Sequence, residues 1–225
     1  MNLYFLVEGK RTETKVYPKW LSVLVPGLER VDDAFEIKNN QYYLFNGGGY
    51  PNILDDIVKA IRDINDIMKY DYFVVCLDAD DFSIEERISE IRKRIESEGL
   101  SLKAQLIIII QNRCFETWFL GNSKVYTRNP QGEFLEYSKF YDVSENDPEL
   151  MGKMENFEES VSKFHEKYLE KMLAERNIRY TKARPYAVCE KTYIDQLKRR
   201  VRDTDDLNTL KEFFDFCERL KKEMA

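Results

Sequence analysis

The sequence of 225 residues is short of cysteine and histidine and contains no long apolar run. Its four cysteines are widely scattered, with no Cys-x-x-Cys pair, which argues against a zinc site and fits a reduced compartment. No apolar run approaches the roughly 20 residues that a membrane-spanning helix needs. Glu8 interrupts the first apolar stretch before a secretory signal could form. We therefore expect a cytoplasmic protein without a membrane partner.

Several common catalytic motifs are also missing. The single histidine, His165, lies in a charged segment, so we expect a solvated surface residue and not a general base. The run of three glycines at 47–49 lacks the lysine and the spacing of a P-loop, which favours a tight turn over a phosphate cradle. The sequence therefore contains no Walker motif. Cys114 has no histidine near it in the sequence to activate it, which argues against a cysteine nucleophile.

The composition indicates a globular protein with a high density of both charges. Hydrophobic residues make up 43% of the chain and aromatic residues 13%, enough for one sizeable core or a core with an appended lobe. The net charge of −6 argues against a protein that coats nucleic acid nonspecifically. A local basic groove remains compatible with that charge.

Apolar runs and amphipathic segments alternate along the first half of the chain. Strands are predicted at residues 2–7, 35–38, 42–45, 72–77 and 104–110. Helices are predicted at residues 12–25, 52–68, 83–98 and 112–120. This alternation predicts an α/β fold with a mostly parallel sheet flanked by helices and joined by right-handed crossovers.

The second half of the chain has a different character. Residues 122–154 are polar and rich in turn signals, and we expect an insertion or lid. Residues 155–225 are predicted to be a helical region packed on the core, with helices at about 157–176, 190–202 and 207–222. The predicted division is therefore an α/β core at 1–121, the insertion at 122–154 and the helical extension at 155–225.

The chemistry is concentrated in the stretch YFVVCLDADD at residues 72–81. Its apolar part predicts a strand buried on both faces, and ligands of open α/β sheets bind at the carboxyl ends of such strands. On an extended segment Asp78 and Asp80 would point to the same side. Neighbouring carboxylates repel unless a cation shares them, so the pattern favours a site for Mg²⁺ or Mn²⁺. We expect Asp80 or Asp81 to cap the next helix.

Further carboxylates follow other strands at the same predicted edge. Glu8 ends the first strand, and Glu13 comes about one helical turn later. Glu116 lies just beyond the predicted strand at 104–110. Because parallel strands end at one edge of a sheet, we expect these side chains to converge with the aspartates.

Three segments together resemble a known family. VEGKRTE at 7–13, followed by LDADD at 77–81, resembles the Toprim domain of topoisomerases, primases and OLD-type nucleases. NRCFETW at 112–118 resembles the Asn-Pro-Cys-Phe-Glu-x-Trp signature of the small stand-alone RloB and OLD-like Toprim proteins, with Arg113 in place of proline. The resemblance covers residues 1–121 and does not extend to the rest of the chain.

The resemblance implies a hydrolase that cleaves nucleic-acid phosphodiester bonds with Mg²⁺ or Mn²⁺, using one or two ions. Asp78 and Asp80 would be metal ligands, and Glu8 a ligand or the general base. Glu13 would contribute to a second metal ion. Asp81 and Glu116 complete the set of candidate ligands, with Glu116 bound to the metal or next to a ligand. Two such ions can activate water and stabilise the leaving oxygen.

Such nucleases also place a basic residue against the phosphate. Lys191 is our first candidate, with Lys182 and Arg184 as alternatives. Lys10 and Arg11 could contact a phosphate backbone or balance nearby glutamates. We expect the basic run at 198–202 to be a solvated helix face. Both tryptophans, at positions 20 and 118, are predicted to lie in the core and not to stack on bases.

The function implied by the resemblance is that of a nuclease acting on nucleic acid, with DNA favoured over RNA, in prokaryotic defence against phage. Because the chain has no Walker motif, an ATPase partner would be a separate protein, and the helical C-terminal region could serve a homodimer. A haloacid-dehalogenase-type phosphatase also uses Asp-x-Asp, but after the first strand, where this chain has Glu8. The remaining alternative is a non-catalytic Toprim-fold adaptor that binds nucleic acid or protein.

Overall fold

A computed structural model describes residues 1–224 of the chain. Within this range the strands form one sheet of five, in the order β2-β3-β1-β4-β5. The pairs β2–β3, β3–β1 and β1–β4 are all parallel. The predicted fold class, an α/β fold with a Toprim-like parallel sheet, flanking helices and helices in the C-terminal region, is confirmed.

The predicted strands at 2–7, 42–45, 72–77 and 104–110 are present close to their predicted bounds, and one further short strand was not predicted. The strands are β1 (Asn2–Val7), β2 (Glu29–Val31), β3 (Gln41–Asn46), β4 (Tyr72–Asp78) and β5 (Gln105–Gln111). The register pairs Val7 of β1 with Cys76 of β4 on one side and with Asn46 of β3 on the other. The central strands therefore reach the same edge of the sheet together.

The α-helices of the described chain are α1 (Glu13–Leu24), α2 (Asn52–Ile67), α3 (Ile84–Ser97), α4 (Phe115–Phe119), α5 (Phe134–Phe140), α6 (Val161–Ala174), α7 (Lys191–Asp203) and α8 (Asn208–Glu223). Short 3-10 helices occur at η1 (Ala34–Glu36), η2 (Pro148–Leu150) and η3 (Tyr186–Cys189). Among the helices of residues 1–224, none combines the length and the apolar character needed to cross a membrane.

The chain divides into two compact units. The first consists of Met1–Leu77, Phe82–Ile110 and the described residues from Asp215 onward, and it contains the sheet. The second consists of Asp78–Asp81 and Gln111–Phe214. This division differs from the predicted boundaries, because the aspartate loop groups with the later residues and the end of α8 groups with the sheet.

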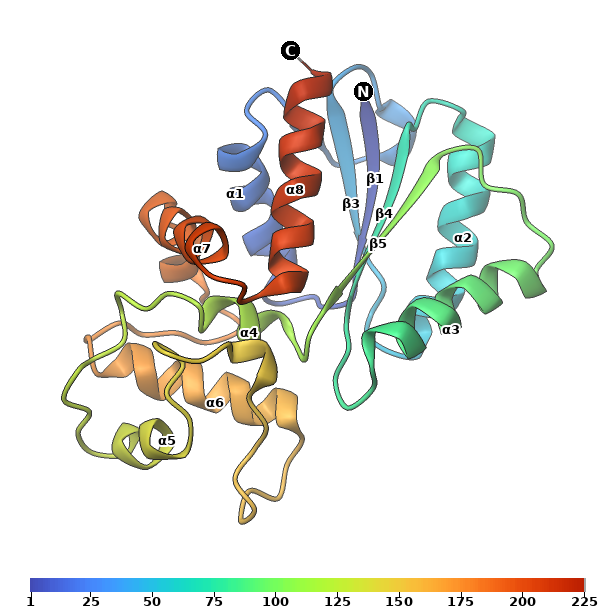
Figure 1. Cartoon of the computed structure of the whole chain (residues 1–225). Helices are drawn as coiled ribbons and strands as arrows, with labels where there is room; N and C mark the ends of the chain where they lie inside the picture. Colours follow the sequence, from blue (N-terminus) through green and yellow to red (C-terminus); the bar gives the residue numbers. More distant parts are fainter. Residues whose placement is uncertain (225) are drawn as a thin grey trace. The chain divides into compact units, whose positions relative to one another are not determined.

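In the first unit, helices cover both faces of the sheet (Figure 1). On one face Tyr4 of β1 packs edge-on against Phe73 of β4, and its hydroxyl lies 3.4 Å from Asp63 of α2. On the other face Phe5 of β1 packs against Tyr17 of α1, with 5.0 Å between ring centroids. Alternate residues of each buried strand thus point to opposite helical layers.

The second unit has an aromatic core built around α4 and α6. Trp118 of α4 stacks on Phe213 and donates from Nε1 to Thr209 Oγ1 at 2.7 Å. Phe134 of α5 packs edge-on against Tyr168 of α6. Because Phe134 is buried, the segment 122–154 supplies core residues and is not only a polar insertion.

Two predictions about local structure are wrong. The predicted strand at 35–38 is instead the 3-10 helix η1, whose first N–H groups are capped by Asp33 through a 2.8 Å bond from Phe35 N. The helix after the aspartates is capped by Ser83, whose side chain accepts from Glu86 N in a capping box. Neither Asp80 nor Asp81 is therefore the cap of α3.

Candidate active site

The loop that leaves β4 is held by the chain that leaves β5. Ala79 N donates to Gln111 O at 2.9 Å, and Asp80 N donates to Arg113 O at 2.7 Å. The Arg113 guanidinium returns a bond to Asp80 O at 3.2 Å. Asp80 has a φ of 52°, in the left-handed region that aspartate enters more readily than most residues. The loop backbone is thus fixed at several points.

This turn changes the expected geometry of the aspartates. Asp78 is the last residue of β4, and the left-handed Asp80 ends the extended run. The strand alternation that would place Asp78 and Asp80 on one side therefore stops before Asp80. Both side chains are partly exposed, whereas Asp81 is exposed. Asp80 keeps a defined direction, because Ser162 Oγ at the start of α6 donates to Asp80 Oδ1 at 2.7 Å.

Glu116 lies buried beside a cation in the second unit. Tyr180 donates from its hydroxyl to Glu116 Oε1 at 2.8 Å, and Lys182 Nζ lies 3.5 Å from Glu116 Oε2. Lys182 Nζ is also 3.7 Å from Glu166 Oε2, on α6. The Lys182 side chain is 41% exposed, while that of Glu116 is 1% exposed. The carboxylates thus hold the ammonium group of a side chain that is itself partly exposed.

The charge of Lys182 is reinforced by its surroundings. Burial alone would lower its pKa, but the negative charges of Glu116 and Asp78, followed by Cys114 and Glu166, outweigh that effect and raise the pKa above its usual value. The same region raises the pKa of the Cys114 thiol, first through burial and then through Glu116 and Asp78. Cys114 is therefore a neutral thiol, in agreement with the rejection of a cysteine nucleophile.

The three candidates for the basic residue that faces the phosphate differ in their surroundings. Lys191, the first candidate, lies at the start of α7, where its ammonium pairs with Asp195 at 2.7 Å and its side chain is 70% exposed. Arg184 is also exposed. Of the three, Lys182 is the one placed among the carboxylates of the second unit. The sequence offered only the basic composition of the stretch as a signal, because Lys182 lies on a loop whose position depends on packing.

Glu8 and Glu13 lie just after the end of β1 and at the start of α1, respectively, in the first unit. Glu8 follows β1, and its Oε1 accepts from Tyr50 N at 3.0 Å. Glu13 is buried in the first turn of α1 and packs on Gly9, where a Cβ atom would lie 1.8 Å from Glu13 Oε2. A side chain at position 9 would therefore displace the Glu13 carboxylate.

The glycine run forms a tight turn. Gly47 N donates to Val7 O at 2.8 Å and Gly49 N to Glu8 O at 3.1 Å, so two of its N–H groups tie β3 to β1. Gly48 and Gly49 have φ values of 71° and 95°, which other residues adopt rarely. Lys10 lies over Gly48, within 3.7 Å of an added Cβ atom. These contacts favour the structural interpretation of the run over a phosphate cradle.

Two predictions about basic or aromatic residues are corrected here, and one is confirmed. His165 is fully buried, with Nδ1 2.7 Å from Thr117 Oγ1 and Nε2 2.9 Å from Met151 O. The expected solvated histidine is therefore wrong. Arg200, in the basic run, is also buried and not part of a solvated face. Trp20 and Trp118 are fully buried, as predicted.

The donor chemistry of the region suits a hard divalent cation. In the first unit Glu8 and Glu13, and in the second unit Asp78 and Asp80, offer carboxylate oxygens, the ligands that Mg²⁺ and Mn²⁺ prefer. In the described residues no three His, Cys, Asp or Glu side chains are grouped as a ready metal site. Comparisons with family models, with curated proteins and with solved structures find no match for this chain.

Proposed function

We propose that the protein is a Mg²⁺- or Mn²⁺-dependent nuclease that hydrolyses phosphodiester bonds of nucleic acid. The observation that supports this most strongly is the braced Asp78–Asp81 loop, with its two partly exposed aspartates, in the same unit as the Lys182 cation. Carboxylates that can hold a cation, with an ammonium group in the same unit, suit metal-assisted attack on a phosphate.

Each residue has a proposed role. Asp78 and Asp80 hold the first cation, Glu8 is a ligand or the general base, and Glu13 and Asp81 contribute to a second cation. A bound cation would supply Lewis-acid activation of water and charge stabilisation. Glu116 holds Lys182 in place through the ion pair at 3.5 Å.

Lys182 replaces Lys191 as the proposed phosphate-facing cation. Its raised pKa keeps it protonated throughout the physiological range, and its side chain is partly exposed. His165 cannot serve as the base in its buried position, because burial lowers its pKa to about 4 and both ring nitrogens are engaged.

The biological setting rests on the resemblance to Toprim proteins. We propose DNA as the favoured substrate, a separate ATPase as partner and a role in defence against phage, in a cytoplasmic protein that could act as a homodimer. The alternative function is a non-catalytic adaptor that has kept the Toprim fold. The intact carboxylates at positions 8, 78 and 80 favour the enzyme over this alternative.

The experiment is a cleavage assay on supercoiled plasmid, linear duplex, single-stranded DNA and RNA with Mg²⁺ or Mn²⁺. Wild type is compared with Asp78→Asn, with EDTA, and with Asp66→Asn as a matched control at an exposed carboxylate of α2. We expect cleavage that needs the metal, disappears in Asp78→Asn and is unchanged in Asp66→Asn. Equal activity of Asp78→Asn and wild type would remove the proposed metal mechanism.

If no substrate is cut, metal binding separates the two remaining explanations. A nuclease that lacks its ATPase partner still binds Mg²⁺ through Asp78, whereas an adaptor need not. Calorimetric titration of wild type and Asp78→Asn with Mg²⁺ measures this directly. Absence of binding in wild type would favour the adaptor.

A further inference from the structure

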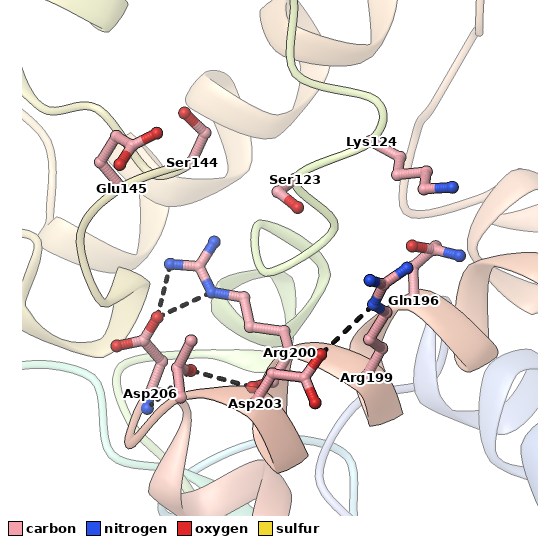
Figure 2. A pocket seen from close by; sticks show the side chains of 10 residues that line it. Ser123, Lys124, Ser144, Glu145, Gln196, Arg199, Arg200, Asp203 and Asp206 are labelled. Atoms are coloured by element: carbon pink, nitrogen blue, oxygen red, sulfur yellow. Dashed lines mark hydrogen bonds and ion pairs between the residues drawn. The ribbon is translucent and has the colours of Figure 1, made fainter.

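Two adjoining hollows open on the second unit. The first has a volume of about 440 Å³ and the second about 650 Å³. Ser123, Lys124, Ser144 and Glu145 line both, so the hollows share a wall, and we call them together the Lys124 groove. Figure 2 shows the first hollow, with Lys124, Gln196 and Arg199 around it.

The groove carries more positive than negative side chains. Arg199 and Arg200 line the first hollow and Arg128 and Arg176 the second, while Lys124 lines both. The carboxylates are Glu145, Asp203 and Asp206. This positive excess belongs to a chain whose net charge is −6, so it is a local feature of this surface.

Two of the carboxylates are already engaged. Asp203 pairs with Arg199 at 3.3 Å, and Asp206 pairs with Arg200 at 2.7 Å. Within residues 1–224, Lys124 and Arg128 form no ion pair, and both are exposed. Two basic side chains in the groove are therefore available to an anion from solution.

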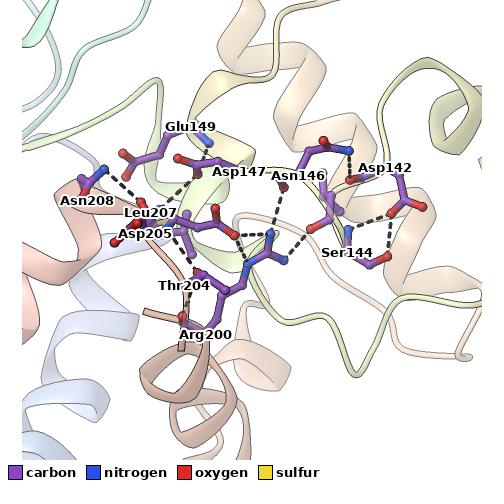
Figure 3. A network of polar contacts seen from close by, with 12 residues as sticks. Asp142, Ser144, Asn146, Asp147, Glu149, Arg200, Thr204, Asp205, Leu207 and Asn208 are labelled. Atoms are coloured by element: carbon purple, nitrogen blue, oxygen red, sulfur yellow. Dashed lines mark hydrogen bonds and ion pairs between the residues drawn. The ribbon is translucent and has the colours of Figure 1, made fainter. Parts of the chain in front are cut away.

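A polar network holds one wall of the groove rigid (Figure 3). Arg200 donates to Val143 O at 2.5 Å and to Asn146 O at 2.9 Å, in addition to its pair with Asp206. Asp147 Oδ1 accepts from Leu207 N at 3.1 Å. The loop at 142–147 is thereby tied to the turn before α8, so the groove is formed before any ligand binds.

The lining suits a phosphate backbone and not a base-reading site. Hydroxyl and amide groups alternate with the basic residues, including those of Ser123, Thr127 and Gln196. Of the described residues that line the groove, only Tyr126 has an aromatic ring, and it is buried. Without an exposed ring there is no platform on which a base could stack.

We propose that the Lys124 groove binds the phosphodiester backbone of nucleic acid through Lys124 and Arg128, an inference that rests on the proposed function. The basic side chains are divided between two adjoining hollows, which matches the spaced charges of a polymer better than one compact anion. Contacts of this kind position a strand without reading its sequence.

The test is fluorescence anisotropy with a labelled duplex and a labelled single strand of about 20 nucleotides, in EDTA so that nothing is cut. The variant is Lys124→Glu/Arg128→Glu. The control, Lys19→Glu/Arg92→Glu, changes the net charge equally at exposed positions of the first unit. We expect binding at least tenfold weaker in the groove variant and no change in the control. The slope of log affinity against log salt concentration should also decrease by the equivalent of about two phosphate contacts.

Several results would overturn the proposal. These are equal binding by wild type and the groove variant, no binding by wild type, and displacement of the labelled strand by ATP at concentrations far below those of a nonspecific anion. Circular dichroism checks that each protein is folded, and Lys124→Gln and Arg128→Gln replace the double variant if it is not. Wild type that binds nucleic acid through the groove but neither cuts it nor binds Mg²⁺ would remove the nuclease proposal and leave the groove.

Discussion

The position of Lys182 between the buried residues Glu116 and Glu166 is the residue-level feature with the clearest chemical consequence. Its ammonium lies 3.5 Å from Glu116 and 3.7 Å from Glu166, so removal of the amine leaves two carboxylates close together. Lys191, in contrast, has one exposed partner on its own helix. The two lysines therefore form a matched pair for mutation.

Lys182→Met is predicted to lower the rate of cleavage by about 10²–10³-fold at saturating metal, the range seen when one charge-stabilising donor is removed. Lys182→Arg should restore part of the rate, because it keeps the charge. Lys191→Met should have little effect. Single-turnover kinetics on the preferred substrate measure all three, and a rate for Lys182→Met equal to that of Lys191→Met would contradict the assignment.

His165 and Glu149 are buried groups whose pKa shifts have opposite effects on the pH dependence of folding stability. Burial lowers the pKa of His165 from 6.5 to about 4 and raises that of Glu149 from 4.5 to about 7. Below pH 6.5 the unfolded chain binds a proton at His165 that the folded chain does not, so acid destabilises the fold. Between pH 4.5 and 7 the folded chain holds a proton on Glu149 that the unfolded chain releases, so acid stabilises the fold.

The contribution of His165 to the pH dependence of stability is predicted to be measurable once Glu149 is replaced by a residue that does not titrate. In a Glu149→Gln background, the free energy of unfolding should fall by up to about 3 kcal/mol as the pH drops from 6.5 to 4. Adding His165→Gln should flatten that part of the profile. Urea unfolding at a series of pH values is the measurement, and an equally steep profile in the double variant would show that another group is responsible.

At the scale of elements, Glu149 links η2 to the first turn of α8. Its carboxylate accepts from Thr209 N at 3.1 Å and from Thr209 Oγ1 at 2.5 Å. Thr209 N is one of the donors that a helix cannot satisfy within its own first turn. Glu149 thus caps α8 from a distant segment, although burial disfavours the charged form of its carboxyl group.

Glu149→Gln is predicted to change stability in a pH-dependent way. Since the raised pKa of Glu149 contributes stability below pH 4.5 that is lost as the pH rises through about 7, the variant should gain on wild type over that interval. The gain should not exceed about 3 kcal/mol, and it should be constant above pH 8. Glu155→Gln, at an exposed position, is the control in the same urea titrations. A pH-independent difference would contradict this account.

The buried elements could be predicted from the sequence because burial leaves a local pattern. The apolar runs of β1, β4 and β5 and the one-sided apolar spacing of α2 all predict the observed elements to within a few residues. The strand β2 leaves no such pattern, since Glu29 and Arg30 are exposed. The strand predicted at 35–38 was wrong because the apolar residue Phe35 is 64% exposed and contributes nothing to the core.

The candidate site was predictable only where it lies at strand ends. Asp78, Glu8 and Glu116 could be named because each directly follows, or nearly follows, an apolar run. Lys182 and Ser162 could not be placed, since their positions depend on how the loop at 180–184 and the helix α6 pack. His165 looked exposed among charged neighbours, but the helical turn brings it to the same face as Tyr168 and Leu169, which are buried.

At the scale of the whole molecule, the proposed metal ligands are divided between the two units. Glu8 and Glu13 belong to the first unit, while Asp78, Asp80 and Asp81 belong to the second. The chain passes between the units directly at Asp78, since Leu77 is the last residue of the first unit there. A cation held by these carboxylates would bind the folded chain and not the unfolded one, so it would raise the stability of the fold, which thermal unfolding measures.

Mg²⁺ at about 100 times its dissociation constant is predicted to raise the midpoint of thermal unfolding by about 5–10 °C, the shift that corresponds to about 2.7 kcal/mol of binding. Asp78→Asn should abolish most of the shift, and Asp66→Asn should leave it intact. No shift in wild type at millimolar Mg²⁺ would contradict the metal site. Glu8→Gln then decides the role of the first unit: loss of the shift would make Glu8 a ligand, whereas an intact shift with lost cleavage would make it the general base.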